Sequence, residues 1–253
     1  MPAPSSAPRP AESMPALPCT VAAIETATPA IRIVHLKLPE GSDFTHRAGQ
    51  YARLGFGGFE VRDYSIASAP EANAPGANAA GDRTLTFHIR DMGGDGPSAY
   101  AARHLRVGET VDLYGPFGDA YLRPEKPGPI LALCGGSGLA PMTAIVEAAL
   151  AQGLTQPIDL YFGARREGDI YREERFARLA AAHPNLNFTP VLSDAEGPTS
   201  RRRGLVTDAV AADFDSLAGR VAYLAGPPPM VEAGVRLCRD LGIAEADIHA
   251  DPQ

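Results

Sequence analysis

The sequence changes character at residues 123–129, RPEKPGP, where three prolines and a glycine interrupt regular secondary structure. Short runs of β-forming residues precede this segment, whereas strand-like and helix-like runs alternate after it. The change predicts two domains in the 253-residue chain. We expect a disordered leader at residues 1–18, a first domain at 19–123, a linker at 124–129 and a second domain at 130–253.

The first domain carries short β-type runs bounded by Gly, Pro or Asp. They lie at residues 19–25, 31–38, 50–56, 59–67, 84–90 and 110–114. One helical stretch, 97–105, interrupts them, and residues 69–81 lack periodicity and are expected to form a surface loop. The spacing of the runs predicts a small antiparallel barrel or sandwich.

The second domain alternates apolar strands with helices. We expect strands at residues 130–133, 158–163, 187–192 and 220–224, and helices at 140–151, 172–182, 206–212 and 230–241. This alternation is typical of an α/β doubly wound parallel sheet, whose ligands bind at the carboxyl ends of the strands.

Composition narrows the function. A formal net charge of −7 disfavours nucleic acid and anionic membrane as partners. The three cysteines, Cys19, Cys134 and Cys238, are too far apart to indicate a disulfide framework or a metal site, and the six histidines lack metal-ligand spacing, so we expect them to be structural or on the surface. No run of about 18 apolar residues is present and the leader lacks the apolar block of a signal peptide, which predicts a cytoplasmic protein.

One strand combines residues that suit a flat, phosphorylated ligand. In the segment RDYSIAS at residues 62–68, Arg62 and Tyr64 share one face and Ser65 lies on the other. A guanidinium, an aromatic ring and a hydroxyl in this arrangement can bind a flavin. Each residue alone is more simply an edge charge or a core ring, so the interpretation depends on phosphate-binding loops elsewhere in the chain.

Two glycine-rich turns precede helical stretches. The first comprises Gly93, Gly94, Gly96, Pro97 and Ser98, and the second comprises Gly135, Gly136, Ser137 and Gly138. Glycines let backbone amides approach a ligand closely, and a helix N-terminus favours negative charge. An ordinary turn with a helix cap explains the first equally well. For the second, which follows an apolar strand, we favour a dinucleotide phosphate over a packing turn, although the pattern G-x-G-x-x-G is absent.

A third turn follows the strand at residues 220–224. It comprises Gly226, Pro227, Pro228 and Met230. Such a rigid turn can wall a flat ring, and its alternative role is a structural stop between strand and helix.

The four motifs R-x-Y-S, G-G-x-x-x-S, G-G-x-G-x-A-P and G-P-P-x-M follow one another along the chain. In this order and spacing they resemble the ferredoxin–NADP reductase superfamily, and more closely its bacterial oxygenase-reductase and ferredoxin–NAD(P) reductase branch, over about residues 19–249. The resemblance implies an antiparallel six-stranded Greek-key β-barrel that binds FAD, followed by an α/β domain that binds a nicotinamide dinucleotide.

The resemblance also implies residue roles. Arg62 would contact the flavin pyrophosphate, Tyr64 would lie against the isoalloxazine and Ser65 would hydrogen-bond its redox-active nitrogen, which makes Tyr64 and Ser65 the candidate catalytic residues. The loop at Gly94, Gly96 and Ser98 would hold the pyrophosphate, the turn at Gly135, Gly136, Ser137 and Gly138 would bind the dinucleotide phosphates, and Gly226 to Met230 would border the nicotinamide. Ile66, Arg90, Gly93 and Pro97 complete the predicted cofactor-binding set.

The choice of dinucleotide depends on one carboxylate. In NADPH-specific relatives a Ser-Arg pair receives the 2′-phosphate, whereas here Ser193 is followed by Asp194. A carboxylate repels a phosphate and can accept a hydrogen bond from a ribose hydroxyl, so we expect NADH. NADPH is the alternative, because Arg165, Arg166 and the arginines at 201–203 supply positive charge.

Three departures from the family accompany this resemblance. Ala225 stands where the family commonly has Cys, and the family's C-terminal aromatic is not present before the last residue, Gln253, so that either the flavin face is open or residues were lost from the end. We also expect no fused iron–sulfur domain in this chain. We therefore expect a ferredoxin–NAD(P)H reductase-type flavoenzyme that takes hydride from NADH onto FAD and passes single electrons to a separate ferredoxin or oxygenase component. The alternatives are an NAD(P)H flavin reductase or diaphorase, and a non-catalytic flavin-binding electron-transfer subunit of a larger complex.

Overall fold

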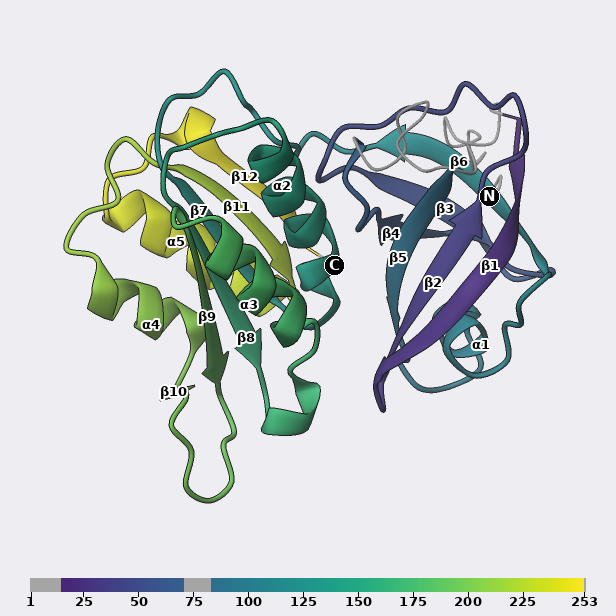
Figure 1. Ribbon diagram of the computed structural model, residues 1–253. Helices are drawn as coiled ribbons and strands as arrows, with labels where there is room; N and C mark the ends of the chain where they lie inside the picture. Colours follow the sequence, from purple (N-terminus) through teal and green to yellow (C-terminus); the bar gives the residue numbers. More distant parts are fainter. Residues whose placement is uncertain (1–14, 71–82, 253) are drawn as a thin grey trace, which may run out of the picture.

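The computed structural model describes residues 15–70 and 83–252, which form two lobes (Figure 1). We call residues 15–70 and 83–123 the antiparallel lobe and residues 130–252 the parallel lobe. Most of the predicted leader and most of the predicted loop at 69–81 lie outside the described residues. Within the described ranges, no helix has the length and apolar character needed to cross a bilayer.

The antiparallel lobe is built on one six-stranded sheet with the order β4-β3-β6-β1-β2-β5. Its elements are β1 (Leu17–Thr28), β2 (Ile31–Lys37), β3 (Tyr51–Gly55), β4 (Arg62–Ser65), β5 (Thr84–Arg90), α1 (Pro97–Arg103) and β6 (Thr110–Phe117). Every strand pair in this sheet is antiparallel. The six predicted strands are confirmed as members of one antiparallel sheet.

Two strand boundaries differ from the prediction for local reasons. β1 begins at Leu17, inside the segment predicted as leader, because this residue pairs with Leu113 of β6. β4 begins at Arg62 rather than at residue 59, because Gly57 and Gly58 adopt left-handed φ values of 40° and 93° and turn the chain just before it.

The parallel lobe is a second six-stranded sheet with the order β10-β9-β8-β7-β11-β12, and its strand pairs are all parallel. Its strands are β7 (Ile130–Gly135), β8 (Ile158–Ala164), β9 (Leu186–Leu192), β10 (Arg202–Arg203), β11 (Val221–Gly226) and β12 (Ile248–Pro252). Its helices are α2 (Leu139–Ala151), α3 (Glu173–Ala182), α4 (Val206–Asp213) and α5 (Pro228–Asp240), and short 3₁₀ turns lie at η3 (Gly136–Gly138), η4 (Glu167–Asp169) and η5 (Glu245–Asp247). The alternation of strands and helices is confirmed, whereas the two edge strands β10 and β12 were missed.

Helices cover both faces of the parallel sheet (Figure 1). Alternate residues of the central strands, such as Ala132 and Phe162, pack with residues of α2 and α3. The residues between them, such as Leu133 and Leu224, pack with residues of α4 and α5. Strands buried on both faces are continuous apolar runs, which is why they could be recognised in the sequence.

The strand β2 is also buried on both faces, because it lies between the two lobes. Val34 and Leu36 belong to the core of the antiparallel lobe. Ile31 and Ile33, on the opposite face, belong to the same apolar cluster as Ile145 of α2 in the parallel lobe. The two lobes therefore share part of a hydrophobic core.

Two turns pack against each other at the carboxyl end of the parallel sheet. The strand order reverses between β7 and β11, and the turns after these two strands meet at this point. A Cβ atom placed on Gly138 would lie 2.1 Å from the carbonyl oxygen of Ala225, and one on Gly226 would lie 2.8 Å from the carbonyl oxygen of Gly135. Glycine is required at both positions because the two backbones touch.

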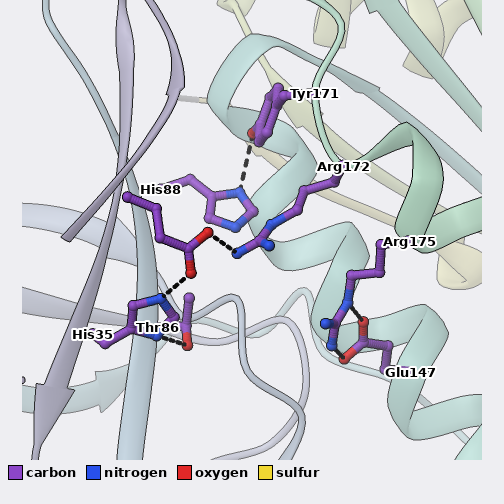
Figure 2. A network of polar contacts seen from close by, with 8 residues as sticks. His35, Thr86, His88, Glu147, Tyr171, Arg172 and Arg175 are labelled. Carbon is purple, nitrogen blue, oxygen red and sulfur yellow. Dashed lines mark hydrogen bonds and ion pairs between the residues drawn. The ribbon is translucent and has the colours of Figure 1, made fainter. Parts of the chain in front are cut away.

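A polar network crosses the interface between the lobes (Figure 2). His88 Nδ1 of β5 lies 3.0 Å from the hydroxyl of Tyr171 in the parallel lobe, and both residues are buried. Glu25 of β1, whose side chain is about half exposed, accepts from His35 at 2.8 Å and pairs with Arg172 of the parallel lobe at 3.4 Å. The two lobes are thus joined by one buried and one partly exposed polar contact.

The imidazole of His88 is neutral in the folded protein. Its side chain is buried, and burial lowers its pKa to about 3, with the positive charges of Arg172 and Arg175 acting in the same direction. Protonation of His88 is therefore opposed both by the loss of water and by the cations around it.

The pH dependence of stability should report this buried histidine. Between pH 6.5 and 3 the unfolded chain binds a proton at His88 that the folded chain does not bind, so the free energy of unfolding falls as the pH drops through this range. The slope is about 1.4 kcal/mol per pH unit, which gives about 2 kcal/mol between pH 7 and pH 5. Urea unfolding of wild type and His88→Phe at both pH values measures this. Equal losses in the two proteins would contradict the assignment.

The contact between the two turns predicts a selective effect of one methyl group. Gly138 has φ −59° and ψ −13°, which alanine also adopts, so Gly138→Ala should be penalised by the clash with the Ala225 carbonyl rather than by backbone strain. We expect a loss of about 1–3 kcal/mol in the free energy of unfolding. Gly168→Ala is the control, since a Cβ there would contact nothing within 4 Å. Similar losses in the two variants would show that the contact is not tight.

Candidate cofactor-binding sites

A cavity of about 480 Å³ opens at the point where the strand order of the parallel sheet reverses. Residues of both lobes line it. From the parallel lobe come Gly135, Gly136, Gly163, Ala164, Arg165, Asp169, Val191, Ser193, Gly204, Leu205, Val206, Thr207, Pro227, Pro229, Met230 and Ala233, and from the antiparallel lobe come Thr28, Ala30, Ile31 and Arg90. The position is the one at which open α/β sheets bind their ligands.

The two predicted turns supply part of this lining. Gly135, Gly136, Pro227 and Met230 line the cavity, whereas Ser137, Gly138, Gly226 and Pro228 belong to the same turns without being among its lining residues. Gly138 and Gly226 are explained by the contact between the turns. Gly136 has φ +57°, and a Cβ on it would lie 3.3 Å from the guanidinium of Arg90, so it is the glycine packed beside a cation at the cavity.

Arg90 stands at the end of β5 and reaches the cavity from the antiparallel lobe. Of the lining residues that come from the antiparallel lobe, Arg90 is the cation. It lies beside the glycine turn after β7. A guanidinium beside open backbone amides is a suitable environment for a phosphate.

Several lining residues were missed in the sequence. The turn between β1 and β2 reaches the cavity because the hydroxyl of Thr28 accepts hydrogen bonds from the backbone amides of Ala30 and Ile31, at 3.2 and 3.0 Å, and holds the turn. A threonine before a proline is a weak turn signal that could have indicated it. Leu205 and Val206, at the start of α4, carry no sequence signal of a ligand site.

Asp194 lies next to Ser193 of the lining and is held by two arginines. Its carboxylate is 3.2 Å from Arg166 Nε and 3.9 Å from Arg165 Nη2, and Arg166 also pairs with Glu196 at 2.9 Å. The arginines at 201–203 have other partners: Arg201 pairs with Glu167 and Glu173, Arg202 with Asp213, and Arg203 donates to the carbonyl of Gly197. Carboxylates therefore neutralise most of the positive charge that could receive a 2′-phosphate.

A second set of predicted residues meets on the antiparallel lobe. The hydroxyl of Tyr64 in β4 lies 2.8 Å from the hydroxyl of Ser98 in α1, which brings the R-x-Y-S strand and the glycine loop together. Burial raises the pKa of Tyr64, so its phenol is protonated at neutral pH. Ser65 is 6% exposed and Ile66 is fully buried. The ring of Tyr64 is only partly buried and lies between the core and the surface.

The loop at residues 91–96 is fixed by two residues that were missed in the sequence. Asp91 accepts a hydrogen bond from the amide of Gly93 at 2.9 Å and forms two hydrogen bonds with Arg103, which in turn donates to the carbonyl of Gly94 at 3.2 Å. Arg103 holds the pKa of Asp91 below its usual value. An aspartate two residues before a glycine is a turn signal that could have identified the first of the pair.

The glycines of this loop leave their backbone open. Gly93 and Gly94 adopt left-handed φ values of 77° and 66°, and a Cβ on either of them or on Gly96 would contact nothing within 4 Å. Pro97 is the first residue of α1, as predicted from its fixed φ. Arg62, the predicted phosphate ligand, is exposed and pairs with Glu60.

An aromatic pair flanks Ser65. Tyr51 is the partner of Ser65 in the β3–β4 register, and its ring lies 5.7 Å from that of Phe117. Burial raises the pKa of Tyr51, and the charges of Asp63 and of Asp251 in β12 contribute in the same direction. The charge of Asp251 in the C-terminal strand of the parallel lobe is therefore felt by Tyr51 of the antiparallel lobe.

Known proteins match this arrangement in sequence and structure. The family model for the oxidoreductase NAD-binding domain matches residues 132–236. Over 92% of its length the chain is 41% identical to the ferredoxin–NAD(P)(+) reductase component of the Pseudomonas putida naphthalene 1,2-dioxygenase system. It is 44% identical to the corresponding component of the Ralstonia naphthalene 1,2-dioxygenase/salicylate 5-hydroxylase systems, and it spans 67% of each relative.

Solved structures have the same fold. The Amycolatopsis cytochrome P450 reductase GcoB superimposes with a TM-score of 0.84 at 34% identity, over 94% of this chain and 69% of that one. A Neisseria gonorrhoeae ferredoxin–NADP⁺ reductase with bound FAD and NADP superimposes with a TM-score of 0.77 at 24% identity, over 94% of this chain and 98% of that one. The chain belongs to the ferredoxin–NAD(P)⁺ reductase family, in the branch of reductase components of oxygenase systems.

Proposed function

We propose that this protein binds FAD on the antiparallel lobe, takes hydride from NADH bound to the parallel lobe, and passes electrons to a separate ferredoxin or oxygenase component. The observation that carries the proposal is the course of the chain after β5. Arg90 reaches the cavity, and the glycine loop that follows it leads into α1. Ser98 of α1 is hydrogen-bonded to Tyr64. One short segment thus borders both proposed nucleotide sites, which brings two bound rings together at the lobe interface.

The residues around the glycine loop fit FAD by their donor set. A pyrophosphate needs cations and hydrogen-bond donors, and Arg62, the open backbone at Gly94 and Gly96, and the hydroxyl of Ser98 supply them. Arg62 would exchange its exposed pairing with Glu60 for the phosphate, and exposed ion pairs of this kind are weak, about 0–1 kcal/mol. FAD is favoured over FMN because a relative of the same fold carries it.

We infer that the antiparallel sheet closes into a six-stranded Greek-key barrel. Its two edge strands are β4 and β5. Ile66, just beyond β4, forms an isolated antiparallel bridge with Phe87 of β5, and the amide of Ala67 donates to the carbonyl of Thr86 at 2.7 Å. These contacts support closure beside the R-x-Y-S strand, where a flavin would lie.

The chain's own residues hold the flavin ring in place. When bound, FAD supplies the hydride acceptor and the group from which electrons leave one at a time. The ring of Tyr64 provides an apolar face of fixed orientation, because its hydroxyl is bonded to Ser98. The hydroxyl of Ser65, which the fold largely shields from water, would hydrogen-bond the isoalloxazine when FAD is bound.

The cavity of the parallel lobe fits a nicotinamide dinucleotide. Its volume of about 480 Å³ is in the range of small-molecule sites. The turn at Gly135, Gly136, Ser137 and Gly138, which opens α2, offers backbone amides to the pyrophosphate, and Arg90 adds a positive charge from the opposite lobe. Pro227 and Met230 provide apolar walls for the nicotinamide, in the turn that also contains Gly226 and Pro228.

We propose NADH as the preferred dinucleotide. Asp194 places a carboxylate beside Ser193 of the cavity lining and occupies the two nearest arginines, Arg165 and Arg166. A 2′-phosphate would meet this carboxylate, whereas a ribose 2′-hydroxyl can donate to it.

We propose a separate electron acceptor and a cytoplasmic location. Among the described residues, no group of three His, Cys, Asp or Glu side chains is placed to hold a metal ion. The relatives are named as reductase components of oxygenase systems, which supports a ferredoxin or an oxygenase as acceptor. The three cysteines are unpaired and buried, as in a reducing compartment.

Ser65→Ala tests the flavin site. Protein reconstituted with FAD should be bleached by NADH under anaerobic conditions, and the variant should keep FAD while its reduction slows by about tenfold or more, because a hydrogen bond at the reacting edge is lost. Ser68→Ala is the control, since its hydroxyl accepts from the Thr86 amide in the same segment. The reoxidation rate with a ferredoxin should exceed that with free FMN. A wild-type protein that binds no flavin would end the proposal.

Asp194→Ala tests the choice of dinucleotide. Removing the carboxylate frees Arg165 and leaves Arg166 with Glu196 as its remaining carboxylate partner, so kcat/KM for NADPH should rise by about tenfold while that for NADH falls. The control is Glu174→Gln, a highly exposed carboxylate of α3 that pairs with Arg178. If the two variants respond to NADPH alike, the effect is one of net charge and Asp194 is not the discriminating residue.

A further inference from the structure

The hydroxyl of Tyr171 links the antiparallel lobe to the glycine turn of the dinucleotide cavity. It lies 3.0 Å from His88 Nδ1 of β5, a contact drawn in Figure 2. It also donates a hydrogen bond to the carbonyl oxygen of Gly136 at 3.2 Å. Tyr171 is 4% exposed and does not belong to the lining of the cavity, so it can act on a ligand only through the turn.

The protons in this chain of hydrogen bonds have one consistent arrangement. Tyr171 has a single hydroxyl proton, and burial raises its pKa well above 10, so the phenol stays protonated. That proton goes to the Gly136 carbonyl, which can only accept. The hydroxyl oxygen must then accept from His88, which fixes the neutral imidazole in the tautomer with the proton on Nδ1.

The ring of Tyr171 is held from several sides. Its edge-on neighbours are His88 at 5.3 Å and Phe162 of β8 at 5.7 Å. The next residue, Arg172, has a left-handed φ of 59°, which is unfavourable for residues other than glycine. Its guanidinium pairs with Glu25 of the antiparallel lobe. The strained backbone beside Tyr171 is therefore stabilised by a second contact between the lobes.

The position of the Gly136 carbonyl controls the direction of the next amide in the glycine turn, that of Ser137. The peptide unit between Gly136 and Ser137 is planar, so the direction of the carbonyl determines the direction of the Ser137 N–H. The carbonyl also accepts from the amide of Leu139 within the 3₁₀ turn. Loss of the Tyr171 hydroxyl would leave the turn in place but remove the contact that orients this peptide from outside it.

We propose that Tyr171 is a positioning residue for the dinucleotide: it aligns the Ser137 amide with the phosphates only while His88 of the antiparallel lobe is docked against it. Binding of the dinucleotide is thereby coupled to the correct seating of the flavin-bearing lobe. This inference rests on the proposed function of the cavity. It assigns a role to two residues that contact neither nucleotide.

Tyr171→Phe removes the hydroxyl and keeps the buried ring. In the FAD-loaded protein we expect the Kd for NAD⁺, measured by titration calorimetry, to rise about fivefold to tenfold, as for the loss of one hydrogen bond. The KM for NADH should rise in parallel, with kcat changing less than about twofold. His88→Phe should raise the Kd as well, although His88 is one residue further from the turn.

Tyr161→Phe is the matched control. Tyr161 is an equally buried tyrosine of the same lobe, and its hydroxyl donates to Asp213 at 2.6 Å, away from the lobe interface. The Tyr161→Phe substitution should lower thermal stability as much as Tyr171→Phe does, without changing the Kd for NAD⁺. Hydrogen exchange of the peptide at residues 133–139, measured without dinucleotide, should be faster in Tyr171→Phe and unchanged in Tyr161→Phe.

The outcomes separate this inference from the proposed function. If wild type binds no NAD⁺, the assignment of the cavity itself fails. If wild type binds NAD⁺ and Tyr171→Phe binds it equally well, the positioning role is overturned, and an unchanged Kd in His88→Phe overturns the coupling between the lobes. Should Tyr171→Phe fail to fold, the Kd measured for His88→Phe decides the question.

Discussion

The structure depends on the direct contact between two backbone turns at the carboxyl end of the parallel sheet. A carbonyl oxygen of β11 lies where the side chain of Gly138 would be. The backbone of the turn after β7 is therefore in direct contact with the backbone at the end of β11. The helices that follow these turns, α2 and α5, therefore begin next to each other at the point where the strand order reverses. The cavity proposed for the dinucleotide lies beside these packed turns, and Gly135, Gly136, Pro227 and Met230 of the turns line it.

The interface between the lobes completes both proposed sites. β2 contributes apolar residues to the cores of both lobes, and β5 leads from Arg90 at the cavity directly into the loop of the proposed flavin site. Buried polar pairs such as His88 with Tyr171 accompany this apolar contact. Hydrophobic burial holds the lobes together, while the polar pairs allow only one relative position, since each buried group needs its particular partner.

The arrangement of charge around the cavity is the basis of the proposed preference for the dinucleotide without a 2′-phosphate. Five arginines stand in two runs, at residues 165–166 and 201–203, and the fold pairs four of them with carboxylates: Arg165, Arg166, Arg201 and Arg202. Arg90 comes from the opposite lobe and points its charge at the glycine turn instead. What a ligand meets is therefore the balance of paired charges and not the count of basic residues.

The amino-acid sequence by itself determined the two-part organisation, the strands buried on both faces, the glycine turns and the family, because each depends on residues that are neighbours in the chain. The strand β4, the helix start at Pro97 and the alternation from β7 to β11 were predictable from periodicity, Gly and Pro. Only the tertiary structure decided the edge strands β10 and β12, the contribution of Thr28 to the cavity and the partners of Asp194, and it showed that Arg90, predicted to bind a cofactor, lines the cavity of the parallel lobe. Histidines expected to be structural or on the surface include His88, whose role arises from Tyr171, a residue 83 positions away. Such pairings connect segments that carry no local signal, and they exist only once apolar burial has brought the two lobes together.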